Sequence, residues 1–284
     1  MNNISINDQK VVKKIVKNSG SSFYWGMNIL KSSRRRAMFA VYAFCRTVDD
    51  IADSELALKK KKNLLNDWVK KIENIYKGLT VDSLTRELDF SIKEYNLIKN
   101  DFLEIIDGMR IDSKKNIIYP PKRDLENYCD KVAGAVGCLS ISIFGIKNKI
   151  SGRSYAKYMG RALQLTNILR DIKEDSERGR CYIFREALEK NNIKMKPEHL
   201  LKSDKLYAVC EEISKVAENY YTLASSESNK INDKGLIAPE IMKNIYLKLF
   251  IKMKKNNWNF NQRIKLSILE KLLVVFSTVL RRRN

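Results

Sequence analysis

The residues best suited to do chemistry lie in the segment YAFCRTVDDIAD, which begins at Tyr42. Its polar side chains recur at the spacing of one helix face: Tyr42, Arg46, Asp49 and Asp53. Asp50 lies at the edge of that face. The flanking residues are mainly apolar, so we expect the acidic face to point into an enclosed space. Carboxylates spaced this way repel one another and tolerate burial only with a cation between them, and oxygen ligands suit Mg²⁺.

A second stretch, GRALQLTNILRDIKED, repeats this design. The side chains that share its polar face are Gln164, Asn167, Asp171 and Asp175. A lone DDxxD is also typical of a solvated acidic patch, and it is the second stripe that favours a metal site. Facing one another across a helical bundle, the two stripes would hold several Mg²⁺ ions with a diphosphate between them.

Ionisation of an allylic diphosphate fits this arrangement, because Mg²⁺ and arginine neutralise the leaving group without any nucleophile. The arginines that could clamp diphosphate oxygens are Arg46, Arg170 and Arg180. For each of them a solvated surface position is the alternative. Ionisation also leaves a carbocation, which the faces of aromatic rings stabilise. The aromatic residues that could do so are Phe23, Tyr42, Tyr128 and Tyr246.

Helical patterns cover almost the whole chain. We expect helices at 7–18, 34–54, 57–77, 81–95, 98–109, 123–144, 151–176, 203–228, 239–256 and 261–280. No linker or shift in composition marks a boundary, which predicts one all-α domain over residues 1–284.

Two clusters have more than one interpretation. The stretch from Ser21 to Trp25, SSFYW, could bind an anion or form a helix cap followed by core aromatic residues. The small residues of VAGAVG, from Val132 to Gly137, indicate a close approach to the helix, either by another helix or by a ligand chain.

Composition narrows the possible partners and location. The formal charge of +21 favours polyanions, whether nucleic acid, lipid headgroups or diphosphates, although a Lys-rich source genome would also raise it. Five cysteines without a CxxC pair fit the reducing cytoplasm. No apolar run reaches a membrane span. The segment 272–280, which precedes three arginines, could lie on an anionic membrane or be a final core helix with a basic tail.

Other catalytic classes lack the residues they need. The only histidine is His199, so we expect neither a Ser-His-Asp triad nor a helical histidine pair for zinc. The chain also has no GxGxxG or P-loop motif.

Along nearly its whole length the chain resembles the squalene/phytoene synthase family of head-to-head isoprenoid synthases. The likeness rests on the motifs SSFYW, RRRAMFAVYAFCRTVDDIAD, DGMRID, YCDKVAGAVG, GRALQLTNILRDIKEDSERGRCYI, IMKNIYLKLF and NQRIKLSILEKL. SSFYW, DGMRID and YCDKVAGAVG are most similar to bacterial presqualene diphosphate synthases of hopanoid and squalene biosynthesis.

The resemblance implies an all-α isoprenoid synthase fold with a central cavity. It implies Mg²⁺, with Mn²⁺ as an alternative ion, on Asp49, Asp53, Asp171 and Asp175. Contacts with diphosphate or its metals would come from Ser22, Arg46, Gln164 and Asn167, and from Arg263 in the C-terminal motif. Tyr42, Tyr128 and Tyr246 would line the cavity. Where the family has Tyr-Leu-Pro after Gly-Arg-x, this chain has Tyr182-Ile183-Phe184, which puts the role of Arg180 in doubt.

The implied reaction is a prenyl transfer that joins two farnesyl diphosphates into presqualene diphosphate. The alternatives are a phytoene synthase that uses two geranylgeranyl diphosphates, and a squalene synthase that continues with NADPH. Peripheral contact with an anionic membrane and no nucleic acid partner are expected. A different class stays open, a basic non-catalytic helical binding or assembly protein, against which the intact carboxylates argue.

Overall fold

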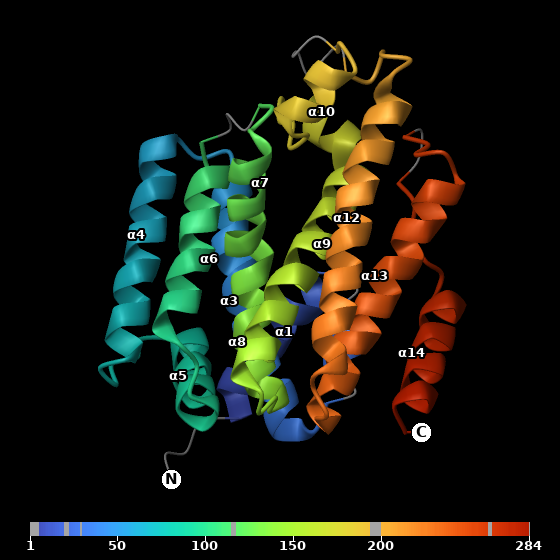
Figure 1. The fold of residues 1–284 in the computed structure, drawn as a ribbon. Helices are drawn as coiled ribbons and strands as arrows, with labels where there is room; N and C mark the ends of the chain where they lie inside the picture. The colour runs from blue at the N-terminus through green and yellow to red at the C-terminus, as the bar shows by residue number, and fades with distance from the viewer. Residues whose placement is uncertain are drawn as a thin grey trace.

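The computed structural model describes residues 6–19, 23–28, 30–114, 118–193, 200–260 and 263–283. Within these ranges the fold is all-α, and its only β-type contact is an isolated bridge between Ile118 and Cys181. The helices (Figure 1) are α1 (Ile6–Asn18), α2 (Phe23–Asn28), α3 (Ser32–Asp53), α4 (Leu58–Ile75), α5 (Ser83–Tyr95), α6 (Lys99–Asp112), α7 (Lys122–Cys129), η1 (Asp130–Gly134), α8 (Ala135–Phe144), α9 (Lys149–Glu177), α10 (Arg185–Lys190), α12 (Leu206–Asn229), η2 (Lys234–Leu236), α13 (Ile237–Lys255) and α14 (Ile268–Arg283).

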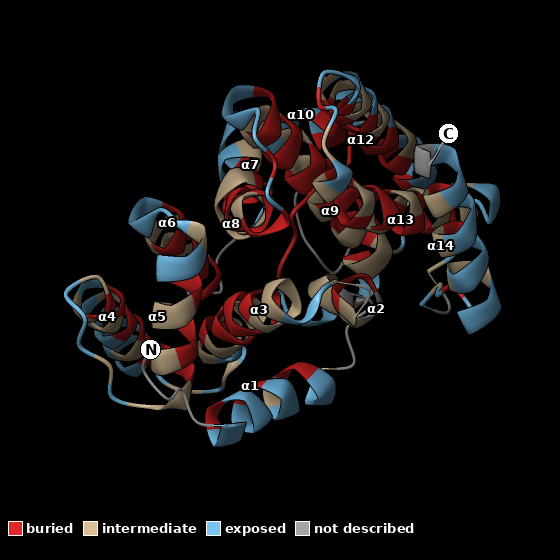
Figure 2. Ribbon diagram, turned by 90° about the horizontal axis from the view of Figure 1, so that it is seen from below, coloured by how far each residue is buried: buried red, intermediate tan, exposed pale blue. Residues whose placement is uncertain are grey.

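Helices α3 and α9 form the centre of the bundle. α3 packs against α1, α5, α6 and α8, and α9 packs against α8, α12 and α13. Seen from below, the buried faces of these helices turn toward one another and the exposed faces of α1, α4 and α14 turn outward (Figure 2). The two helices predicted to carry the acidic stripes are therefore interior elements, as their apolar flanks indicate.

Close contact between η1–α8 and α9 depends on glycine. A Cβ added at Gly160 would lie 2.6 Å from the backbone N of Gly134, and one at Gly137 would lie 3.1 Å from the carbonyl O of Ala156. The small residues of this segment thus let a neighbouring helix approach. The prediction of one α-helix over 123–144 was wrong in one respect, because η1 is a π-helical turn between α7 and α8.

The structure differs from the predicted helices in three further places. Helices α2 and α10 were not expected, and both are only six residues long. Residues 263–267 are not helical, and α14 begins at Ile268 instead of residue 261. The start is set by a capping box: the Ser267 N–H donates to the Glu270 carboxylate at 2.7 Å, and the Glu270 N–H donates to Ser267 Oγ at 3.2 Å.

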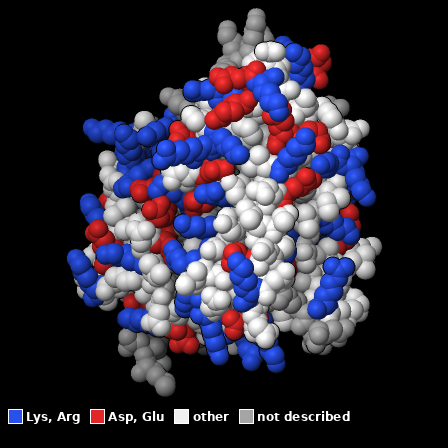
Figure 3. Space-filling model, in the orientation of Figure 1, with Lys and Arg blue, Asp and Glu red and all other residues white. Residues whose placement is uncertain are grey.

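On the face seen in Figure 3, basic side chains are spread out rather than gathered into one patch. Figure 3 shows Lys and Arg across the visible face, interleaved with fewer Asp and Glu. In the part of the chain that the structure describes, no helix has both the length and the apolar content to cross a membrane.

Candidate active site

The two acidic stripes lie at the C-terminal ends of α3 and α9, which meet at the same end of the bundle (Figure 1). Arg180, which follows α9, donates from Nη1 to Oδ1 of Asp53 at 3.0 Å and so ties the two ends together. The C-terminal end of a helix carries partial negative charge. Two such ends, each with carboxylates, form a site that attracts cations.

Arginine side chains cover the carboxylates of both stripes. On α3, Arg46 pairs with Asp49 at 2.8 Å and also with Asp50. On α9, both oxygens of Asp171 accept hydrogen bonds from Arg170, at 2.8 and 2.6 Å. Arg263, exposed just before α14, lies 3.0 Å from Asp171. A diphosphate held at metal ions on these carboxylates would meet the same guanidinium groups.

Burial changes the acidity of one carboxylate on each stripe. Burial and repulsion from Asp53 raise the pKa of Asp49 to about 6. Burial and repulsion from Asp171 raise the pKa of Asp175 to about 7. Both groups would be favoured as carboxylates by a bound cation, because an opposite charge stabilises the ionised form.

The donor set fits Mg²⁺ when the substrate supplies part of the coordination. Asn167 Oδ1 is buried without a hydrogen-bond partner, and it precedes Asp171 by one helical turn. Among the described residues no three His, Cys, Asp or Glu side chains converge on one point. Mg²⁺ commonly takes only one or two protein carboxylates and completes its octahedron with phosphate oxygens and water, so a complete protein cage is not required.

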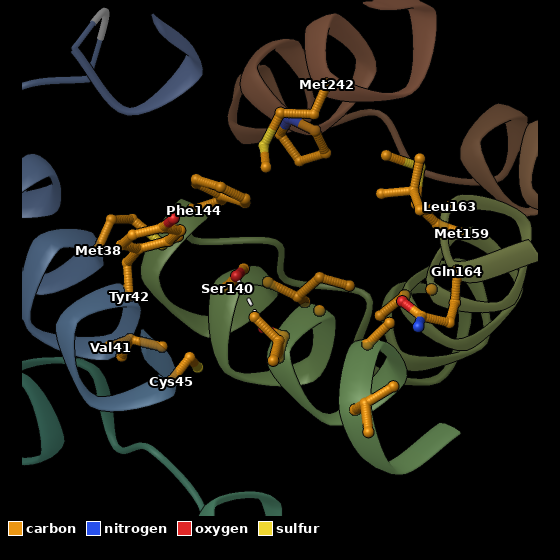
Figure 4. A pocket seen from close by; sticks show the side chains of 18 of the residues that line it. Met38, Val41, Tyr42, Cys45, Ser140, Phe144, Met159, Leu163, Gln164 and Met242 are labelled. Atoms are coloured by element: carbon orange, nitrogen blue, oxygen red, sulfur yellow. Dashed lines mark hydrogen bonds between the residues drawn. The ribbon is translucent and has the colours of Figure 1, made fainter. Parts of the chain in front are cut away.

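An apolar cavity of about 230 Å³ lies between the central helices. Figure 4 shows side chains from α3, α8, α9 and α13 pointing into it. Its walls include Met38, Val41, Tyr42, Cys45, Val136, Phe144, Met159, Leu163, Gln164, Asn167 and Met242. Val132, Ala133, Gly137 and Gly160 also line it, so the small residues of VAGAVG serve helix contact and ligand space together.

A second cavity of about 210 Å³ adjoins the first on the side of the carboxylates. Tyr42, Cys45, Val132 and Gln164 line both cavities. The second cavity adds polar residues, namely Arg46, Asp49, Asp112 and Tyr128. A polar cavity that adjoins an apolar one fits an elongated molecule with an anionic head and a hydrocarbon tail.

The structure does not bring every predicted residue to the cavities. Tyr246 is buried and its hydroxyl bonds to Arg170, and neither residue lines the two cavities. Ser22 lies outside the described residues, and the side chain of Phe23 is not described. Tyr42, Tyr128, Gln164 and Asn167 do line them.

Asp112 and Tyr182 belong to the site and were not predicted. Asp112 accepts hydrogen bonds from Tyr128 at 3.0 Å and from Tyr182 at 2.8 Å. Burial raises the pKa of Asp112 to about 7. The signal in the sequence was the second Asp of DGMRID, an acid that directly follows the apolar Ile111 on this helix.

The loop after α9 holds Arg180 over the site even though it lacks the proline typical of this position. Gly179 has a φ of +70°, and the N–H of Arg180 donates to the carbonyl of Asp175 at 2.8 Å. The carbonyl of Cys181 accepts from the N–H of Tyr119 at 3.0 Å. Backbone bonds at both sides therefore fix the buried Arg180.

Comparison with known proteins agrees with this geometry. The chain is 43% identical to presqualene diphosphate synthase of Zymomonas mobilis over 86% of its own length and 84% of the relative. It is 39% identical to the presqualene diphosphate synthase of Sinorhizobium fredii over 80% of the chain and 81% of the relative.

A crystal structure of a dehydrosqualene synthase in complex with ligand superimposes with a TM-score of 0.87. The match covers 98% of this chain and 97% of that one at 26% identity. The squalene/phytoene synthase family model matches residues 16–270. The chain belongs to the squalene/phytoene synthase family.

Proposed function

We propose that this prenyltransferase condenses two molecules of farnesyl diphosphate head to head into presqualene diphosphate and releases one diphosphate. The observation that carries the proposal is the pair of acidic helix ends placed over an apolar cavity. The relatives named presqualene diphosphate synthase support the choice of substrate and product.

Mg²⁺ is the proposed cofactor, with Mn²⁺ as a substitute. Its ligands would come from Asp49 and Asp53 on α3 and from Asn167, Asp171 and Asp175 on α9. When bound, the ions supply the positive charge that neutralises the leaving diphosphate. Arg46, Arg180 and Arg263 already lie against these carboxylates and would bind the remaining diphosphate oxygens.

The proposed reaction starts with the donor. Its C1–O bond breaks, and the electron pair leaves with the diphosphate. Donor C1 then bonds to the double bond of the acceptor, and loss of a proton closes the cyclopropane. The proton passes to the released diphosphate or to Tyr42. The apolar walls would exclude water from the cation, and Tyr42 and Tyr128 line the space that it would occupy.

Separate incubations with farnesyl and geranylgeranyl diphosphate test the substrate. We expect presqualene diphosphate from the farnesyl substrate with Mg²⁺, and no product when EDTA removes the metal. Turnover of geranylgeranyl diphosphate alone would identify a phytoene synthase instead. Adding NADPH tests the third alternative, because squalene in that incubation would show that the reaction continues past presqualene diphosphate.

A non-catalytic basic helical protein remains the alternative of another class. It predicts no turnover of either diphosphate and tight, salt-dependent binding to DNA. The raised pKa values of Asp49 and Asp175 argue against this non-catalytic alternative. Buried acids with strongly raised pKa values are typical of functional sites.

We also propose that the protein works in the cytoplasm and contacts the membrane peripherally. Its five cysteines are all free thiols, as in a reducing compartment. The proposed product has two long prenyl chains, which need an apolar environment such as the interior of a membrane.

A further inference from the structure

Helix α14 is apolar on two opposite faces, and within the described ranges of the chain only one of them packs on another helix. One face packs on α13, where Asn244 donates to the buried Thr278 at 2.9 Å and Lys252 pairs with Glu270 at 3.0 Å. Val274 is buried on this same face. A helix with apolar side chains around most of its circumference is normally covered on every side.

The opposite face is exposed. Leu269, Leu273 and Phe276 have exposed fractions of 73%, 63% and 67%. They share that face with Leu272 and Leu280, which are also exposed. These five residues, here named the α14 stripe, follow the spacing of one helix face. Figures 1 and 2 place α14 at the outer edge of the bundle, beyond α13, with its outward side exposed.

Elsewhere in the part of the chain that the structure describes, exposed apolar residues do not form such a stripe. Ile150, at 84% exposure, is on α9, and Val81, at 70%, lies in the loop before α5. Scattered single residues of this kind are ordinary on protein surfaces. A continuous stripe of large aliphatic and aromatic side chains is not, and it indicates a binding surface.

The charges beside the stripe decide what binds there. Residues 263–284 contain six Lys and Arg and one acid, Glu270, which is already paired with Lys252. Three of the basic residues, Arg281 to Arg283, directly follow the stripe. A second copy of this +21 chain would bring the same positive charge to the contact. An anionic lipid surface offers both the apolar layer and the opposite charge.

We propose that α14 docks on an anionic lipid bilayer, with the α14 stripe buried at the level of the acyl chains and Arg281 at the headgroups. Docking needs no substrate. If the proposed function also holds, it has a further consequence. Helix α13, on which α14 packs, carries Pro239 and Met242 in the wall of the apolar cavity, so docking would bring the product close to lipid.

Vesicle sedimentation with the purified full chain tests the docking. The vesicles are phosphatidylcholine and phosphatidylglycerol in a ratio of about 7:3, and pure phosphatidylcholine is the comparison. We expect wild type to bind the anionic vesicles at least about tenfold more tightly than the neutral ones. The double variant Leu269→Ser/Phe276→Ser should lose at least about tenfold in partition coefficient. The matched control Val81→Ser/Ile150→Ser removes equally exposed apolar side chains elsewhere and should bind like wild type.

A second variant guards against misfolding of the first. Phe276→Trp keeps the stripe apolar, and its added fluorescence should shift to shorter wavelength with anionic vesicles. Unchanged emission, or equal vesicle binding by wild type and the stripe variant, would overturn the proposal. So would a wild-type dimer that the stripe variant converts to monomer without any vesicle binding, because the stripe would then join two copies. None of these measurements depends on turnover, so failure here is distinct from failure of the proposed reaction.

Discussion

Individual carboxylates in this site pair with arginines. Asp171 accepts from Arg170 and pairs with Arg263, while Asp49 and Asp53 pair with Arg46 and Arg180. Each guanidinium limits the repulsion among acids that share a buried space. A bound metal–diphosphate complex would carry charge of both signs. Its metal ions would then pair with the carboxylates and its phosphate oxygens with the arginines, so that neither group is left without an opposite charge.

Replacing Asp171 with Asn should lower turnover by roughly two orders of magnitude or more, because a proposed metal ligand and the partner of two arginines are lost together. The measurement is the rate of product formation with saturating Mg²⁺, together with the rise in melting temperature that Mg²⁺ and inorganic diphosphate produce. Asp67→Asn on the exposed side of α4 is the matched control and should behave like wild type. Full activity of Asp171→Asn would remove the metal mechanism.

Asp112 predicts a pH dependence of stability whose sign follows from its raised pKa. The usual value of 3.8 becomes about 7 in the folded protein, so between these values the folded state keeps a proton that the unfolded chain releases. The free energy of unfolding therefore falls as pH rises through this window. From pH 5 to 8 wild type should lose on the order of 2–3 kcal/mol that Asp112→Asn does not lose.

Urea unfolding of both proteins at pH 5 and 8 without metal isolates this contribution, because the other titrating groups are common to both. Parallel losses in the two proteins would show that Asp112 does not hold a proton in the folded state.

At the scale of elements, the contact between α9 and η1 sets the width of the cavity. Gly160→Ala would place a Cβ 2.6 Å from the backbone N of Gly134 and force the helices apart. We expect a loss of at least about 2 kcal/mol in unfolding free energy, larger than the gain in helix propensity. Gly152→Ala on the same helix meets only the ends of Ile141 and Ile146 side chains and is the matched control. Thermal unfolding of the two variants should rank Gly160→Ala as clearly less stable.

The capping box of α14 is a second element whose contribution can be measured. Ser267→Ala removes the acceptor for the Glu270 N–H and should destabilise the start of the helix by about 1 kcal/mol. Hydrogen exchange of the first-turn amides of α14 should accelerate. Ser277→Ala, which removes only a bond to the Val274 carbonyl within the helix, should leave that exchange unchanged. Equal exchange in both variants would count against the cap.

For the whole molecule, the order of residues along α3, α8 and α9 gives the cavity a direction. Asp49 and Tyr128 line the polar cavity at one end, and Met38, Phe144 and Tyr155 line the apolar cavity toward the other. A prenyl chain whose diphosphate binds the carboxylates would point its tail at Phe144, which lies in the wall of the apolar cavity (Figure 4). The distance between these two ends limits the length of the prenyl chain that the cavity accepts. Residues from several helices together set this distance.

Phe144→Leu should therefore raise the rate with geranylgeranyl diphosphate relative to farnesyl diphosphate, because it removes part of the far wall. The ratio of the two rates is the measurement, since it is insensitive to a general loss of folded protein. Phe102→Leu, at a buried position packed on Phe44 outside the cavity, should leave the ratio unchanged. An equal ratio in both variants would place the limit elsewhere.

The sequence by itself determined the helical fold, the two acidic stripes and the small residues between Val132 and Gly137. These are local properties, because side-chain spacing on one helix is set by 3.6 residues per turn whatever the rest of the chain does. It also carried two signals that were not used, the capping box at Ser267 and the second Asp of DGMRID.

Only the tertiary structure decided which side chains meet. Asp112 joins Tyr128 and Tyr182, Arg180 reaches Asp53, and Tyr246 turns to Arg170 instead of the cavities. The structure also showed that one apolar face of α14 packs on α13 and the other is exposed. Contacts between residues far apart in the chain depend on the angles at which helices cross and on their rotation about their axes. The sequence alone also does not show whether an apolar helix face is buried or exposed.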